Sequence, residues 1–174
     1  MPKLPEQIAQ IIEKEYQFPD KILIGQVATL CSEGPWVRSL RVYGIEDKLG
    51  LIFLTHNGSR KWKQLEARGV LSLCLVHPEY AYQLSARCQV QVLSQNGNEE
   101  LFQKYWKMVR DDVKATYYEK SPSSFESVPQ TLGIIVAIPE YWESLHLEND
   151  YPQSQRYTYE KQKDRWHETR IPLH

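Results

Sequence analysis

The chain has 174 residues and a formal net charge of −1, which allows one domain with a sizeable hydrophobic core. Hydrophobic residues make up 41% and charged residues 25%, as in ordinary soluble globular proteins. The near-zero charge gives no general attraction to nucleic acids or membranes. No apolar run is long enough to cross a bilayer. We therefore expect neither a nucleic acid nor a membrane as partner.

The cysteines indicate a reducing compartment. Cys31, Cys74 and Cys88 form no C-x-x-C pair, and the first residues contain no apolar segment typical of a signal peptide. An odd number of cysteines without such a signal predicts free thiols and a cytoplasmic location. The five histidines are scattered, so no metal site is expected.

The first half of the chain reads as one helix followed by strands. A helix is predicted over residues 4–16, where Ile8, Ile11 and Ile12 share one face. A short helix over 60–68, closed by Gly69, interrupts the strands that follow. These strands are predicted from β-branched or alternating residues between turn signals, at 21–31, 36–45, 51–55, 70–77 and 82–93.

The second half begins with a long helical pattern over 98–118, in which Leu101, Tyr105, Met108 and Val109 share one face. Residues 119–131 are rich in Ser and Pro and are predicted to form a mobile loop. Short strands are predicted after it, at 133–139, 142–148, 156–161 and 165–171.

Consecutive strands predict an antiparallel sheet rather than a doubly wound fold. Closure into a barrel would remove exposed strand edges. No internal repeat or linker is visible. We expect a single, mainly β domain over residues 1–174, flanked by the N-terminal helix (1–18) and the long helix (98–118).

The segment HNGSRKWKQL, residues 56–65, places two cations where a helix begins. A helix N-terminus already carries partial positive charge, so Arg60 and Lys61 are unfavourable there unless an anion accompanies them. Ser59 is a good N-cap, and Gly58 allows a ligand to approach the backbone closely. The free amides and the two cations predict a phosphate-sized anion site, which the hydroxyl of Thr55 would complete. The alternative is a solvated loop with two surface cations.

Several segments of the chain resemble the pyridoxamine 5′-phosphate oxidase family of FMN-binding proteins. Their order and spacing agree with the family over roughly residues 20–171. The segments are PWVRSLRV, LIFLTHNGSRK, YQLSARCQVQVL, KYWKMVRDD, EYWESL and QRYTYEKQKDRWHETRIPL. The resemblance implies a Greek-key, antiparallel split β-barrel that binds FMN. It also implies an obligate homodimer with two FMN sites at the subunit interface.

The resemblance further implies which residues contact FMN. Arg38 would face the ring and phosphate, Arg60 and Lys61 would hold the phosphate, and Gln83 would reach FMN from the second subunit. The full set of implied cofactor contacts is Arg38, Leu54, Thr55, Ser59, Arg60, Lys61, Gln83, Lys120, Ser121, Trp142 and Arg156. Taken singly, several of these residues have simpler interpretations, such as core packing for Trp142 and a surface ion pair for Arg156.

The substrate side of the family pattern is less complete. Tyr43 stands where the oxidases have a lysine, Tyr105 matches a substrate-binding tyrosine, and Arg110 is offset from an arginine. The late Arg-x-His pair of the oxidases has no counterpart in residues 150–155. Loss of two charge-assisted bonds, each worth roughly 1.5–3 kcal/mol, would weaken a phosphate ester on the order of a hundredfold.

The leading hypothesis is an FMN-dependent oxidoreductase that resembles pyridoxamine/pyridoxine 5′-phosphate oxidase and acts on CH–NH2 donors with oxygen. The sequence leaves open whether its substrate is pyridoxamine phosphate or a different compound. The flavin would supply the chemistry, and the sequence identifies no separate catalytic residue. The alternative is a dimer that binds FMN or another phosphorylated ring compound without turnover. A weaker alternative is a barrel that binds haem or a deazaflavin.

Overall fold

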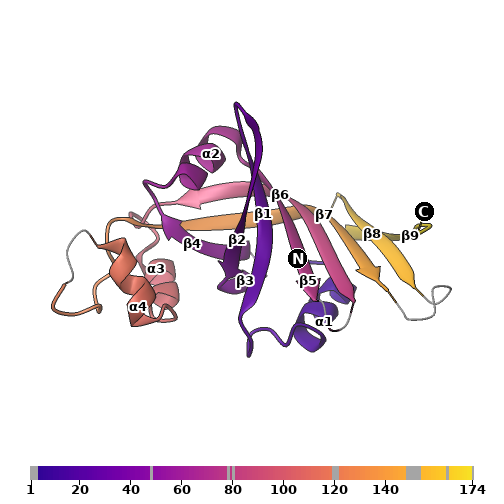
Figure 1. Ribbon diagram of the computed structural model, residues 1–174, viewed down its shortest axis with the longest axis horizontal. Helices are drawn as coiled ribbons and strands as arrows, with labels where there is room; N and C mark the ends of the chain where they lie inside the picture. The colour runs from indigo at the N-terminus through magenta and orange to yellow at the C-terminus, as the bar shows by residue number, and fades with distance from the viewer. Residues whose placement is uncertain are drawn as a thin grey trace.

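The computed structural model describes residues 4–47, 49–77, 79, 81–118, 122–147, 154–163 and 165–173. Within them, nine strands form one antiparallel sheet, flanked by short helices (Figure 1). The helices are α1 (Glu6–Lys14), α2 (Arg60–Arg68), α3 (Glu99–Trp106), α4 (Asp111–Lys114) and the 3₁₀ turn η2 (Ala115–Tyr117). The strands are β1 (Leu23–Cys31), β2 (Gly34–Val42), β3 (Gly44–Glu46), β4 (Gly50–His56), β5 (Val70–His77), β6 (Tyr82–Leu93), β7 (Leu132–His146), β8 (Gln155–Gln162) and β9 (Arg165–Arg170).

The sheet follows the order β2-β1-β5-β6-β7-β4-β3, and the β8–β9 hairpin extends it from the second half of β7. β2 pairs with β1, whereas β3 pairs with β4, because the chain changes partner at Tyr43. Between these two edges the described residues show no pairing, so the barrel is split rather than closed. The antiparallel split barrel is thus confirmed, whereas the closure that would have removed every edge is not found.

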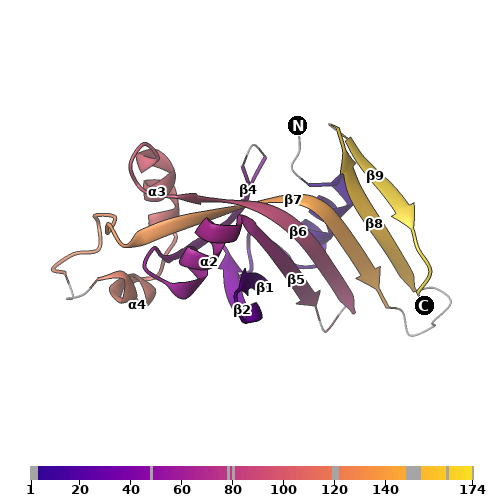
Figure 2. The same cartoon turned by 90° about the horizontal axis from the view of Figure 1, so that it is seen from above.

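Two hydrophobic clusters lie on opposite faces of β4. Leu51 and Phe53 face the inside of the curved sheet, where Ile8 of α1 and Leu65 of α2 also pack. Ile52 and Leu54 face outward and pack with α3. Figure 2 shows α3 and α4 at one end of the long axis and the β8–β9 hairpin at the other. None of the described helices has the length and apolar character needed to span a bilayer.

β7 is one strand of 15 residues, whereas two strands, 133–139 and 142–148, were predicted. Pro139 suggested a break, but it lies where β7 has left β4 and not yet met β8. The register with β6 shifts at this point, because Cys88 is opposite Pro139 and Arg87 is opposite Tyr141. This bulge accommodates the missing N–H of the proline, and the strand continues.

The predicted helix over 98–118 is wrong in its length, because α3 ends at Trp106 and α4 begins at Asp111. Arg110 between them is extended, with φ −69° and ψ 149°. The turn lets Val109 and Tyr117 join the same outer cluster as Tyr105, which a straight rod would carry past the sheet. Asp111 and Asp112 in the first turn of α4 are the helix-start signal that marked this break.

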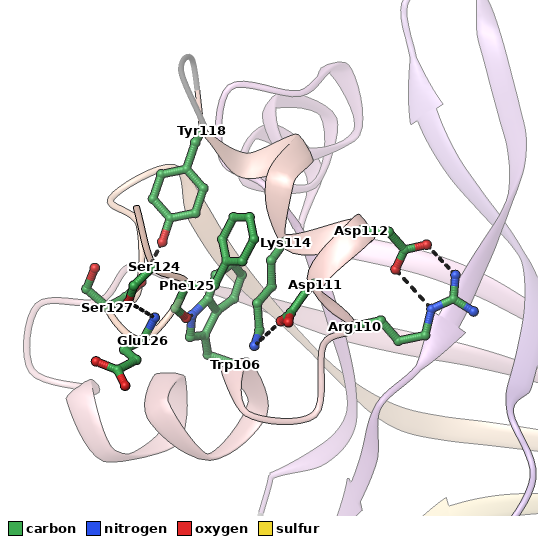
Figure 3. A network of polar contacts seen from close by, with 10 residues as sticks. All are labelled: Trp106, Arg110, Asp111, Asp112, Lys114, Tyr118, Ser124, Phe125, Glu126 and Ser127. Carbon is green, nitrogen blue, oxygen red and sulfur yellow. Dashed lines mark hydrogen bonds and ion pairs between the residues drawn. The ribbon is translucent and has the colours of Figure 1, made fainter. Parts of the chain in front are cut away.

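Residues 122–131 form no helix or strand, as expected of a loop, but several contacts hold them (Figure 3). Nε1 of Trp106 donates a 2.8 Å hydrogen bond to the carbonyl oxygen of Phe125. The Tyr118 hydroxyl donates one of 2.6 Å to the carbonyl oxygen of Ser127. The Lys114 ammonium lies 5.5 Å from the centre of the Trp106 ring. The two hydrogen bonds fasten the loop to residues 106–118, and the contact between Lys114 and Trp106 lies within that segment.

Candidate functional site

The start of α2 matches its prediction. Ser59 is extended, and its Oγ accepts a 3.3 Å hydrogen bond from the backbone N–H of Trp62. The first turn contains no acidic residue. Among the described residues, the backbone N–H groups of Arg60 and Lys61 have no acceptor. The helix start therefore offers two free donors and two cations together, with no carboxylate in the turn to offset them.

Trp62 fixes α2 against the sheet. Its side chain is buried and lies over Gly133 of β7, where a Cβ atom would come within 2.3 Å of the indole ring. Leu65, one turn further along, is also buried in the inner cluster. Only a glycine at position 133 lets the indole lie so close to β7, and this contact sets the position of the helix start.

Lys61 points from α2 towards the end of β4. Its Nζ donates a 2.9 Å hydrogen bond to Oγ1 of Thr55, which lies 3.2 Å from Oγ of Ser59. Burial lowers the pKa of Lys61, and the positive charge of Arg38 lowers it further. Thr55, Ser59 and Lys61, which were predicted from adjacent sequence positions, are therefore brought together by the fold.

Arg38 joins the same site from β2. Its Nη1 and Nη2 donate to Oγ1 of Thr29, at 2.5 Å, and to Oε1 of Gln64, at 3.0 Å. Burial lowers the pKa of Arg38, and the charge of Arg60 lowers it further. Sequence reasoning missed Thr29 and Gln64, although Gln64 falls one turn after Arg60 on the predicted helix and Thr29 follows the inward-facing alternation of β1.

Arg60 takes a different direction from Lys61. Its guanidinium lies 3.5 Å from Glu33 and 4.5 Å from the centre of the Trp36 ring, both on the β1–β2 hairpin. The ion pair is exposed on both sides. Three cations thus surround the start of α2, and Glu33 is the carboxylate that one of them contacts.

This arrangement has the chemistry that an anion site requires. Mutual repulsion of Arg38, Arg60 and Lys61 is relieved when an anion with several acceptor oxygens lies among them, and a phosphate dianion has that chemistry. The hydroxyls of Thr55 and Ser59 add donors at the same place. Leu54 is not part of this group, because its side chain faces the outer cluster on the other side of β4.

The other implied cofactor residues lie on two different faces of the sheet. Gln83 and Arg156 are both register partners of Leu145, so their side chains share the outer face. There Arg156 pairs with Glu143, with Nη2 at 2.9 Å from Oε1. Trp142 points to the opposite face and is fully buried in the inner cluster. Lys120 and Ser121 lie outside the described residues.

The substrate-side residues are already engaged within the chain. The Tyr105 hydroxyl donates a 2.5 Å hydrogen bond to Glu46, and the Arg110 guanidinium pairs with Asp112. Tyr43 is buried in the outer cluster, with the Arg41 guanidinium 4.6 Å from its ring centre. Tyr43, Tyr105 and Glu46 line a cavity of about 860 Å³ between α1, β3 and α3. A phosphate ester in this cavity would face the Glu46 carboxylate beside Tyr105, and position 43 has no lysine to bind it.

The fold defines the chain as an antiparallel split-barrel protein, with three cations gathered at the start of α2. The chain belongs to the pyridoxamine 5′-phosphate oxidase family, because the family model described as "Pyridoxamine 5'-phosphate oxidase" matches residues 5–146. Comparison with curated proteins gives no match.

Solved structures share the fold at low sequence identity. A pyridoxamine 5′-phosphate oxidase-related, FMN binding protein from Nostoc punctiforme PCC 73102 is 18% identical, with a TM-score of 0.77 over 97% of this chain and 98% of that chain. PhzG from Burkholderia lata 383, solved with tetrahydrophenazine-1-carboxylic acid, is 19% identical, with a TM-score of 0.71 over 95% and 89%. An F420 reductase is 19% identical, with a TM-score of 0.52 over 80% and 98%.

Proposed function

We propose that this protein is an FMN-dependent flavoprotein oxidoreductase whose anion site holds the FMN phosphate. The observation that carries the proposal is the meeting of Arg38, Arg60 and Lys61 at a helix start without an acidic residue in its first turn. The Nostoc protein, described as FMN binding, supports the choice of ligand.

In this assignment the residues of the site bind and orient. Lys61 and Arg38 would neutralise the phosphate, Thr55 and Ser59 would donate hydroxyl hydrogen bonds, and the free N–H groups of α2 would complete its shell. When bound, FMN supplies a ring that accepts a hydride equivalent from a donor and is reoxidised by oxygen. Holding the phosphate fixes the position of the ring relative to β2.

The protein is further proposed to act as a homodimer. The outer face of β1, β2 and β5 exposes Ile24, Leu30, Val37 and Val76, each between 45% and 60% exposed. Gln83 and Arg156 lie on the continuation of this face across β6 to β8. A second subunit that covers the apolar surface would bring its own Gln83 and Arg156 to the neighbouring flavin. Light scattering of the purified protein measures the oligomeric state.

The substrate is proposed to differ from pyridoxamine phosphate. Glu46 accepts the hydrogen bond of the Tyr105 hydroxyl and Asp112 pairs with Arg110, so a second phosphate would have to compete with a carboxylate at both groups. A CH–NH2 donor without a phosphate fits this environment better than a phosphate ester.

The same engaged residues favour a second candidate function, a dimer that binds FMN without turnover. Reduction of the bound flavin by an amine donor, followed by reoxidation in air, would support the oxidase and exclude the binder. An F420 reductase shares the fold, so a deazaflavin is a further candidate cofactor. Haem is a candidate on the basis of the fold alone. Mass spectrometry of the ligand extracted from the purified protein separates these cofactors.

The absorption spectrum of the purified protein tests the cofactor directly. We expect bound-flavin peaks, or their appearance after FMN is added and the excess removed. A colourless protein that stays colourless after FMN addition would contradict the proposal.

A further inference from the structure

Gln64 links α2 to two strands through one atom. Its Oε1 accepts a 2.6 Å hydrogen bond from the hydroxyl of Thr29 on β1 and a 3.0 Å hydrogen bond from Nη2 of Arg38 on β2. The Thr29 oxygen in turn accepts from Nη1 of Arg38, at 2.5 Å. Gln64 is 8% exposed and Thr29 is 1% exposed. The three side chains therefore form a closed ring, in which Thr29 and Gln64 are buried and Arg38 is partly buried.

We propose that Gln64 is a positioning residue that holds Arg38 in place for the phosphate of the ligand, an inference that rests on the proposed function. A guanidinium only donates hydrogen bonds, so Gln64 must present its amide oxygen to Arg38. The ring uses Nη1 and Nη2 from one side and leaves other N–H groups of the guanidinium for a ligand. It also holds the Arg38 side chain in one rotamer before the ligand arrives, so less conformational entropy is lost on binding.

The amide nitrogen of Gln64 takes no part in this ring. Nε2 is buried and has no hydrogen-bond partner among the described residues. Rotation of the amide would not help, because it would point the nitrogen at Arg38, which donates as well, and would lose both bonds to Oε1. The ring therefore sets the orientation of the amide, with Oε1 toward Arg38, although Nε2 is left without a protein acceptor.

A purely structural role is the rival explanation, in which the ring only fastens α2 to the sheet. The two roles differ in their dependence on the phosphate. A structural role predicts equal losses of affinity for FMN and for riboflavin, which lacks the phosphate. A positioning role predicts a loss confined to FMN that disappears when Arg38 is absent.

The test uses Gln64→Met, which keeps the length of the side chain and removes the acceptor. Dissociation constants for FMN and riboflavin are measured by fluorescence titration. We expect FMN to bind about tenfold more weakly and riboflavin to bind unchanged, as for the loss of one hydrogen bond to a charged group. In an Arg38→Met background the same change should cost nothing further. Lys63→Met, an exposed change on α2, is the control and should leave both constants unaltered.

Thr29→Val provides a second variant if Gln64→Met folds poorly, because it keeps the shape and removes the other side of the ring. It should also weaken FMN selectively. Equal losses for the two ligands, or an undiminished loss without Arg38, would overturn the positioning role. If the wild-type protein binds FMN and both variants bind it equally well, this inference is wrong but the proposed function stands. If the wild-type protein binds neither flavin, the proposed function is wrong as well.

Discussion

Nζ of Lys61 lies 2.9 Å from Oγ1 of Thr55, so the second residue of α2 is bonded to the last inward-facing residue of β4. Thr55 is 3% exposed, and the lysine therefore carries its charge into a partly buried place. The charge that acts on it is also positive, since Arg38 lowers the pKa of this lysine. Such an arrangement costs stability in the ligand-free protein, and a bound anion would offset this cost.

Replacement of Lys61 by Met should weaken FMN binding while leaving riboflavin binding nearly unchanged. The variant removes a charge-assisted contact to the phosphate, worth roughly 1.5–3 kcal/mol, or about 10- to 100-fold in affinity. Fluorescence titration with the two ligands measures both constants. Lys63→Met on the same helix is the matched control, because that side chain is exposed. Similar losses for FMN and riboflavin would show that the phosphate is held elsewhere.

Glu33→Gln should tighten FMN binding. Glu33 contacts Arg60 at 3.5 Å and competes with the phosphate for the guanidinium. Exposed ion pairs contribute little free energy because solvent screens them, so the gain should be small. Glu66→Gln, an exposed acid on α2, changes the net charge by the same amount and serves as control. An equal gain in the control would assign the effect to net charge rather than to competition at Arg60.

The pH dependence of binding should report Lys61. Burial and Arg38 hold its pKa below the ordinary value of 10.5 in the flavin-free protein, and a bound phosphate would raise it. FMN affinity should therefore be full below the lowered pKa and fall as the pH rises through it. The ratio of FMN to riboflavin affinity isolates this effect, since both ligands carry the same ring. A ratio that stays constant up to about pH 10.5 would exclude Lys61 as the titrating contact.

The stability of the flavin-free protein should change in the opposite direction. A lysine whose pKa is lowered on folding binds its proton more tightly in the unfolded chain. The free energy of unfolding therefore rises with pH between the lowered pKa and 10.5. Chemical denaturation across this range, compared with Lys61→Met, measures the contribution. The variant should lack the rise.

Much of this site was predictable because it is local in sequence. The N-cap Ser59, the two cations after it and the closing Gly69 define α2 within a dozen residues, and the structure has the helix at the predicted bounds. Strand alternation likewise identified most of the sheet. The resemblance to the oxidase family added Arg38 on β2, which the structure brings near Lys61, and Leu54 on β4, which faces the outer cluster instead.

The rest required contacts between distant segments. Gln64 and Thr29 are polar residues at inward positions, and only the packing of α2 over β1 shows that they meet Arg38. The predicted helix over 98–118 was wrong in its length, because a turn at Arg110 lets Val109 and Tyr117 pack into the outer cluster, which a continuous helix would not. Pro139 was wrongly predicted to end a strand. A bulge at the point where β7 changes strand partner accommodates the missing N–H of the proline. Each of these outcomes depends on tertiary contacts that no short window contains.

The contact between Trp62 and Gly133 leads to the last prediction. A Cβ atom at position 133 would lie 2.3 Å from the indole, and the buried ring has no solvent to move into. Gly133→Ala should lower the free energy of unfolding by about 1–3 kcal/mol, as other overpacking changes do. It should also weaken FMN binding, because displacement of Trp62 moves the start of α2 and with it Lys61. Denaturant unfolding and FMN titration measure the two effects. Trp62→Phe reduces the ring, so the double variant should lose less than the sum of the single changes. Additive losses would mean that the two residues do not press on one another.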